Sequence, residues 1–137
     1  MIQKILCPTD GTDHSDIAVV HAAQLAAKFG ASLTICVVNI AHGGPRGPVI
    51  PHWSDQEMSE KLDRATALAQ ENGVAEAKRV DIISREAAAG IVSYAEQNGF
   101  DQIVVGTGDK RGLSRLMLGS VAADVMARAH CAVTVAR

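Results

Sequence analysis

The chain has 137 residues and a formal net charge of -2, and this length fits one domain, since domains typically have about 100–150 residues. Hydrophobic residues make up 47% and charged residues 20% of the chain, which excludes an intrinsically disordered or collagen-like protein. The slight negative charge argues against an electrostatic nucleic-acid binder, and every uninterrupted apolar run is too short to span a bilayer.

Short apolar runs, which predict strands, alternate along the whole chain with amphipathic or alanine-rich segments, which predict helices. In chain order we expect a strand over Ile2–Cys7, a helix over Asp13–Phe29, a strand over Leu33–Ile40, a loop over Ala41–Trp53, a helix over Ser54–Asn72, a strand over Ala77–Ile83, a helix over Arg85–Gln97, a strand over Gln102–Val105, a helix over Arg115–Ala129 and a strand over Ala132–Ala136.

Polar residues and glycines mark the expected helix boundaries. Asp13 is the expected N-cap of the first helix, and Gly30 its C-terminal stop. The spacing of Ser54 and Glu57 predicts a capping box at the second helix. Ser84 is the expected cap of the third helix.

The βαβαβαβαβ alternation predicts an α/β fold, because right-handed crossovers place parallel strands in one sheet with helices on both faces. We expect a five-stranded, parallel, doubly wound sheet in the order 3-2-1-4-5, with four helices in a three-layer α/β/α arrangement over the single domain 1–137. Ligands of such sheets bind outside the carboxyl ends of the strands, where the strand order reverses. The residues that follow each strand are therefore the first candidates for a site.

The turn after the fourth predicted strand is rich in glycine. Four of the twelve glycines fall within residues 106–119, namely Gly106, Gly108, Gly112 and Gly119. Glycines let backbone N–H groups turn towards an anion, and a following helix N-terminus adds a partial positive charge. Lys110, Arg111 and Arg115 add positive charge to this segment. A tight turn that only needs glycine for packing is the alternative.

Two generic phosphate motifs are absent from this turn. The dinucleotide pattern GxGxxG fails because Arg111 stands where its third glycine should be, and no GK[ST] sequence of a P-loop occurs.

Three stretches resemble the universal stress protein family. They are the opening ILCPTDGTDHS, the segment LSRLMLGSV (113–121) and the closing HCAVTVAR. ATP-binding members of that family carry a glycine, two residues, a second glycine, nine residues, and then glycine with Ser or Thr. Gly106, Gly119 and Ser120 match this spacing. The resemblance covers essentially the whole chain and implies a stress-response module that binds ATP, alone or together with Mg²⁺, as a homodimer.

The resemblance also implies where the nucleotide binds. Asp10 lies on the adenine and ribose side, and Val38 matches the position whose backbone contacts adenine. The implied binding residues are Pro8, Thr9, Asp10, Val38, Val105, Gly106, Gly108, Asp109, Gly119, Ser120, Val121 and Ala122.

Asp109 departs from the family motif, because it stands where the second glycine belongs. A carboxylate beside the phosphates would repel them, unless Gly108 takes the place of that glycine or Mg²⁺ bridges Asp109 to phosphate. The alternative function is therefore a dimeric interaction protein that has lost nucleotide binding.

Other functions find less support in the residues. A response-regulator receiver needs a phosphoacceptor aspartate at the end of the third strand and a lysine after a later strand, but here Asp81 is set back within the third strand and no lysine follows the last strand. An enzyme of the related adenine-nucleotide α-hydrolase type needs catalytic residues, and no base or nucleophile stands out. The five histidines form no HxxxH or HExxH motif, so no metal site is expected and slow ATP hydrolysis is the most that we expect.

Cys7, Cys36 and Cys131 lie in apolar stretches without a CxxC motif, and the N-terminus lacks a secretory h-region. We therefore expect reduced, structural thiols in a cytoplasmic protein that is not inserted in a membrane. Trp53 is expected to pack on the following helix as a hydrophobic staple rather than to stack on adenine. His42 and His52 are expected to be solvated loop residues.

The terminal strand 132–136 is expected at one edge of the sheet. It carries no charge until Arg137, so its outer backbone groups are open to pairing. Pairing with the same strand of a second copy would give a two-fold homodimer. The family resemblance implies such a dimer, and any further protein partner is unknown.

Overall fold

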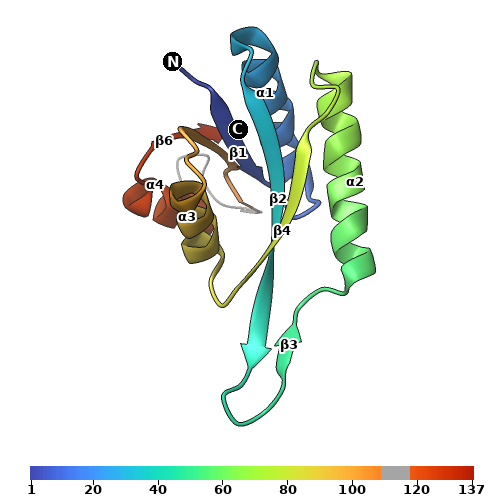
Figure 1. Cartoon of the computed structure of the whole chain (residues 1–137), viewed down its shortest axis with the longest axis vertical. Helices are drawn as coiled ribbons and strands as arrows, with labels where there is room; N and C mark the ends of the chain where they lie inside the picture. Colours follow the sequence, from blue (N-terminus) through green and yellow to red (C-terminus); the bar gives the residue numbers. More distant parts are fainter. Residues whose placement is uncertain (109–117) are drawn as a thin grey trace.

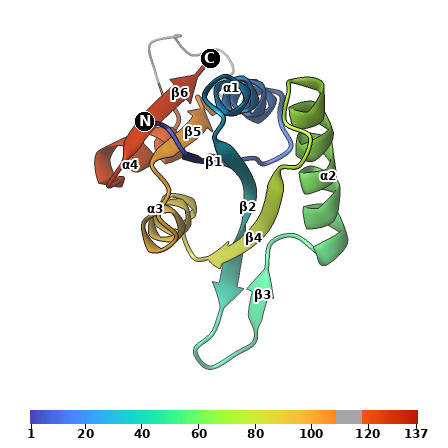
Figure 2. The same cartoon turned by 45° about the horizontal axis from the view of Figure 1, so that its top comes forward.

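The computed structural model describes residues 1–108 and 118–137, which form one mixed sheet covered by helices (Figures 1 and 2). In chain order the elements are β1 (Lys4–Pro8), α1 (Asp13–Phe29), β2 (Ser32–Gly43), β3 (Val49–Pro51), α2 (Asp55–Glu71), β4 (Lys78–Ser84), α3 (Ala87–Gln97), β5 (Gln102–Gly106), α4 (Ser120–Arg128) and β6 (Ala132–Ala136).

Five parallel strands lie in the order β4-β2-β1-β5-β6, which confirms the predicted topology. The central strand β1 pairs with β2 along its whole length, from Lys4 to Pro8. Its pairing with β5 is confined to Ile5 and Leu6. The strand order reverses between β1 and β5. Because these two strands pair at only two positions, their carboxyl ends are not paired with each other.

The two faces of the sheet bury different side chains because successive residues of a strand point to opposite sides. Ile5 and Cys7 of β1 belong to the core under α1 and α2, whereas Leu6 between them belongs to the core with α3 and α4. β2 is buried on both faces over residues 33–39, as its continuous apolar run predicts. The three-layer α/β/α arrangement is therefore confirmed.

The segment 41–53 differs from the predicted loop. β2 continues to Gly43, and the chain returns as β3, which pairs antiparallel with the end of β2. The sequence did not predict this hairpin, because the glycines and prolines of the segment are typical of a loop. Gly43 and Gly44 adopt positive φ in its turn, and Pro51 lies in a strand of only three residues, where a missing N–H donor is tolerated. The sheet thus gains a sixth, antiparallel strand.

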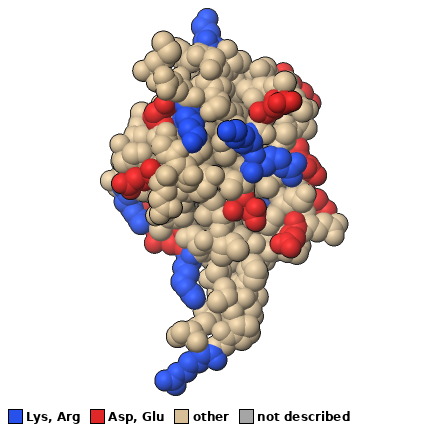
Figure 3. All heavy atoms as spheres, in the orientation of Figure 1, with Lys and Arg blue, Asp and Glu red and all other residues tan. Residues whose placement is uncertain are grey.

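We call residues 41–51 the arm. It contains the carboxyl end of β2 together with β3, and it projects from the rest of the molecule at the bottom of Figure 1. The space-filling view shows a mostly uncharged surface on the arm, with a positive side chain at its tip (Figure 3). Val49 and Ile50 of the arm are 56% and 58% exposed.

Two predicted helix boundaries are confirmed. Gly30 ends α1 in the left-handed conformation, with φ of 66°. The side chain of Ser54 accepts a hydrogen bond from the backbone N–H of Glu57, and the carboxylate of Glu57 accepts one from the backbone N–H of Ser54. The capping box therefore starts α2 where the sequence predicts it.

Three other boundaries were predicted wrongly. The N-cap of α1 is Thr12 rather than Asp13. Ser84 ends β4 and bonds the backbone of Glu86, which is the N-cap of α3. The predicted start of α4 at Arg115 lies outside the described residues, and residues 118 and 119 are not helical, so α4 begins at Ser120. Several residues near the start of each helix are able to cap it, and the local sequence does not determine which of them is the N-cap.

Cys7 and Cys36 are fully buried in the sheet, and no disulfide involves them. Burial raises the pKa of the Cys36 thiol to about 12 and also raises the pKa of Cys7. Both thiols stay protonated at neutral pH, as expected of structural cysteines. Within the described ranges, no helix is long and apolar enough to cross a membrane.

Candidate functional site

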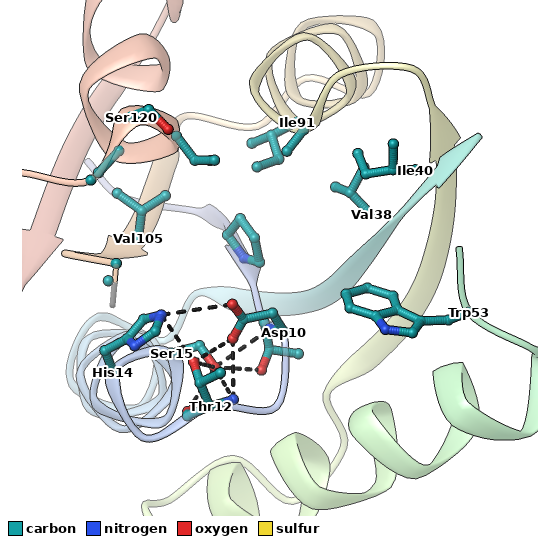
Figure 4. A pocket seen from close by; sticks show the side chains of 18 residues that line it. Asp10, Thr12, His14, Ser15, Val38, Ile40, Trp53, Ile91, Val105 and Ser120 are labelled. Carbon is teal, nitrogen blue, oxygen red and sulfur yellow. Dashed lines mark hydrogen bonds and ion pairs between the residues drawn. The ribbon is translucent and has the colours of Figure 1, made fainter. Parts of the chain in front are cut away.

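A cavity of about 420 Å³ opens at the carboxyl ends of β1, β2 and β5. It lies at the reversal of strand order, where open α/β sheets bind their ligands. Its volume falls within the range of small-molecule sites, about 300–1,000 Å³. The cavity is therefore the candidate functional site (Figure 4).

The structure brings together all the predicted site residues that it describes. Those lining the cavity are Pro8, Thr9, Asp10, Val38, Val105, Gly106, Gly108, Gly119, Ser120, Val121 and Ala122. Asp109 lies outside the described residues. The sequence analysis missed seven further lining residues, which are Thr12, His14, Ser15, Ile40, Trp53, Ala87 and Ile91.

Polar side chains of the turn between β1 and α1 form one wall of the cavity. Thr9 Oγ1 and Ser15 Oγ lie 3.0 Å apart, and Ser15 Oγ also accepts a hydrogen bond from the backbone N–H of Thr12. Asp10 Oδ1 accepts hydrogen bonds from the backbone N–H and the hydroxyl of Thr12. His14 Nε2 lies 3.7 Å from Asp10 Oδ2 (Figure 4). These contacts fix the conformation of the turn.

The carboxylate of Asp10 is held in its charged form. Its partial burial opposes ionisation, but hydrogen bonds from Thr12 and Ser15 and the nearby His14 outweigh that effect and lower the pKa of Asp10. Asp10 is therefore ionised at neutral pH. An ionised carboxylate in the wall of a cavity accepts hydrogen bonds and suits ligand hydroxyl groups.

Glycines shape one end of the cavity because backbone segments approach one another closely there. A Cβ at Gly106 would lie 2.5 Å from the carbonyl oxygen of His14. A Cβ at Gly119 would lie 2.7 Å from the carbonyl oxygen of Thr107, which accepts the N–H of Gly119 at 2.6 Å. Gly108 has φ of 88° and packs against Gly119. These contacts bring the end of β5 against the starts of α1 and α4.

The N-terminus of α4 also reaches this end of the cavity. Its N-cap is Gly119, which has no side chain to accept from the first N–H groups of the helix. Ser120, Val121 and Ala122 line the cavity, and the first turn contains no acidic residue. Uncapped N–H groups and the positive end of the helix dipole favour an anion.

The remaining end of the cavity is apolar. Val38 and Ile40 contribute from β2, and Ile91 contributes from α3 (Figure 4). Val38 is 8% exposed and Ile91 2% exposed, so the walls belong to the core. Since Val38 and Ile40 are two residues apart on one strand, Ile40 was predictable from Val38 by strand alternation alone.

Trp53 also lines this apolar end, although the sequence did not predict it as a site residue. Its backbone exchanges two hydrogen bonds with the buried side chain of Asn39, each 2.9 Å long. Because Asn39 belongs to β2, these bonds attach the segment ahead of α2 to the sheet. No local signal in the sequence connects Trp53 with Asn39.

The cavity can therefore hold a ligand with a flat apolar part, hydroxyl groups and an anionic part. Within residues 1–108 and 118–137, no three His, Cys, Asp or Glu side chains gather to hold a metal ion. The residues of the two ends and of the Asp10 wall between them come from β1, α1, β2, α3, β5, α4, the loops that flank them and the segment ahead of α2. The fold brings these parts together at the point where the strand order reverses.

Comparisons with known proteins agree with this architecture. The model of the universal stress protein family matches residues 1–137. The chain is 36% identical to universal stress protein MJ0531 of Methanocaldococcus jannaschii, covering all of this chain and 83% of that protein. It is 32% identical to universal stress protein YxiE of Bacillus subtilis, with both chains covered in full. A universal stress protein solved in complex with cAMP shares 26% identity and a TM-score of 0.78, over 98% of this chain and 97% of that one.

Proposed function

The chain belongs to the universal stress protein family, and from this premise we propose that its cavity binds an adenine nucleotide. The observation that carries the proposal is the division of the cavity into an apolar end, a carboxylate wall and a glycine-lined end at a helix N-terminus. The solved relative in complex with cAMP supports the same class of ligand.

In this proposal each part of the nucleotide meets a matching part of the cavity. The adenine lies against Val38 and Ile40, and a ribose hydroxyl donates to the carboxylate of Asp10. The phosphates lie at Gly106, Gly108, Gly119 and the first residues of α4, where the uncapped N–H groups of the helix favour an anion. Pro8, Thr9 and Val105 complete the walls between these groups.

We propose ATP as the physiological nucleotide, with Mg²⁺ as a counter-ion for its phosphates. The protein would act in the cytoplasm as a regulatory module of the stress response, with nucleotide occupancy signalled to a partner. Fractionation of the cells that produce it tests this location. No residue is assigned to ATP hydrolysis, so the proposed activity is binding.

Calorimetric titration of the purified protein with ATP, AMP and cAMP, with and without Mg²⁺, tests the nucleotide site. We expect saturable binding of adenine nucleotides, with ATP gaining affinity from Mg²⁺ if the metal bridges its phosphates. Absence of binding at millimolar ATP would support the alternative, a dimeric interaction protein whose nucleotide site is inactivated by Asp109. In that case Asp109→Gly should restore binding, because the motif glycine returns.

We also propose that β6 mediates a homodimer. Among the strands that the structure describes, β6 pairs with β5 alone, and no Lys, Arg, Asp or Glu lies within it. Pairing with β6 of a second copy would satisfy this edge. Sedimentation equilibrium should give twice the chain mass of 14.4 kDa. A single-chain mass at micromolar protein would refute the dimer.

A further inference from the structure

Trp53 is the single tryptophan of the chain. One residue, His52, separates it from the arm, and it precedes Ser54, the N-cap of α2. Figure 4 shows its indole extending into the cavity from this segment, on the same side as Val38 and Ile40. The tryptophan therefore lies at the apolar end, away from Ser120 and the start of α4.

The position of the indole is set in advance by contacts on two sides. The amide of Asn39 holds the backbone of Trp53 through both its oxygen and its nitrogen. Lys61 of α2 places its Nζ 4.5 Å from the centroid of the indole. A ring held this way loses little conformational freedom when a ligand packs against it.

Trp53 differs from the other residues of the apolar end because its side chain is aromatic. Val38, Ile40 and Ile91 are aliphatic, so they can bury a base but offer no aromatic surface. Tyr94 and Phe100 pack against each other elsewhere, with ring centroids 5.8 Å apart. Among the described residues that line the cavity, Trp53 is the one with a Phe, Tyr or Trp ring, and the imidazole of His14 lies beside Asp10.

We propose that Trp53 is the base-stacking residue of this site and sets its preference for nucleotides with a large base. This inference rests on the proposed function, because binding of the phosphates at the start of α4 directs the base of a nucleotide towards Trp53. Base–aromatic stacking contributes about 1–3 kcal/mol per base. Trp53 also packs against the core cluster that contains Met58 and Leu62 of α2, as expected of a staple, and base stacking is an additional role.

Intrinsic fluorescence of the wild-type protein gives the first test, since all tryptophan emission comes from Trp53. Titration with AMP should change this emission with the same midpoint as the calorimetric titration. Calorimetric binding without any change in emission would overturn the proposed stacking.

Substitution of Trp53 gives the second test. Trp53→Leu keeps an apolar side chain without a π-face and should weaken AMP binding about tenfold. Trp53→Phe keeps a π-face and should remain within about threefold of the wild-type affinity. Equal losses in both variants would indicate a packing role and overturn stacking, as would unchanged affinity in both. Thermal unfolding of each variant checks that it is folded.

Phe29→Leu serves as the matched control, because it makes the same change from an aromatic to an aliphatic side chain at a residue that does not line the cavity. The affinity for AMP should change by less than about twofold. A tenfold loss in Phe29→Leu would show that removal of an aromatic ring far from the cavity weakens binding equally, and would overturn the proposal. Failure of the wild-type protein to bind any nucleotide would refute the proposed function first, and this inference with it.

Discussion

Replacing Gly119 with valine should reduce the affinity for adenine nucleotides at least 100-fold, which corresponds to about 2.7 kcal/mol. A Cβ at this position would lie 2.7 Å from the carbonyl oxygen of Thr107 and 3.2 Å from Cα of Gly108. Both neighbours are backbone atoms, so they cannot move aside as a flexible side chain would. The two segments that form the proposed phosphate end would have to separate.

Calorimetric titration with ATP measures this loss, and Gly47→Val provides the matched control. Gly47 belongs to the arm, and a Cβ there would meet no atom within 4 Å. The control should bind ATP with wild-type affinity, and both variants should retain their helical circular dichroism. Binding by Gly119→Val within threefold of the wild type would show that this glycine contact does not shape the nucleotide site.

Replacing Gly106 with alanine should lower the free energy of unfolding by about 2 kcal/mol, the range typical of overpacking. A Cβ at the end of β5 would lie 2.5 Å from the carbonyl oxygen of His14 and 3.1 Å from its carbon. These atoms belong to the first turn of α1, so the helix would have to move away from the sheet. The lower chain entropy of unfolded alanine offsets only about 0.4–1 kcal/mol of that cost.

Urea unfolding followed by circular dichroism measures this change, and Gly47→Ala is the control. The control should leave the free energy of unfolding within about 0.5 kcal/mol of the wild type, as is usual for surface substitutions. A destabilisation by Gly106→Ala no larger than that of the control would show that α1 accommodates the extra methyl group without strain.

The sheet topology was predictable because burial patterns are local. The run over residues 33–40 is apolar at nearly every position, which marks a strand covered on both faces. By contrast, β3 was missed because a three-residue strand has no periodicity of its own and pairs only with the extended end of β2. The residues with which β3 pairs, at the end of β2, could be identified only from the folded hairpin.

The residues of the site likewise include some that the sequence predicted and others that it did not. Asp10 and Gly106 follow strands, so their place at the carboxyl edge was predictable once the topology was known. Trp53 follows the arm and precedes a helix, and its sequence context indicates only a residue packed on that helix. Its place in the cavity depends on hydrogen bonds to Asn39, which lies 14 positions earlier in the chain.

Length, composition and charge excluded whole classes of protein, and the placement of the glycines identified the edge of the sheet that carries the site. Why these positions are glycine was decided only by the tertiary structure, because the obstructing atoms belong to other segments. The carbonyl of His14 faces Gly106 across 92 positions of chain, and the carbonyl of Thr107 faces Gly119 across the turn before α4. Local patterns specify which element forms, whereas close contact between segments distant in sequence exists only in the folded chain.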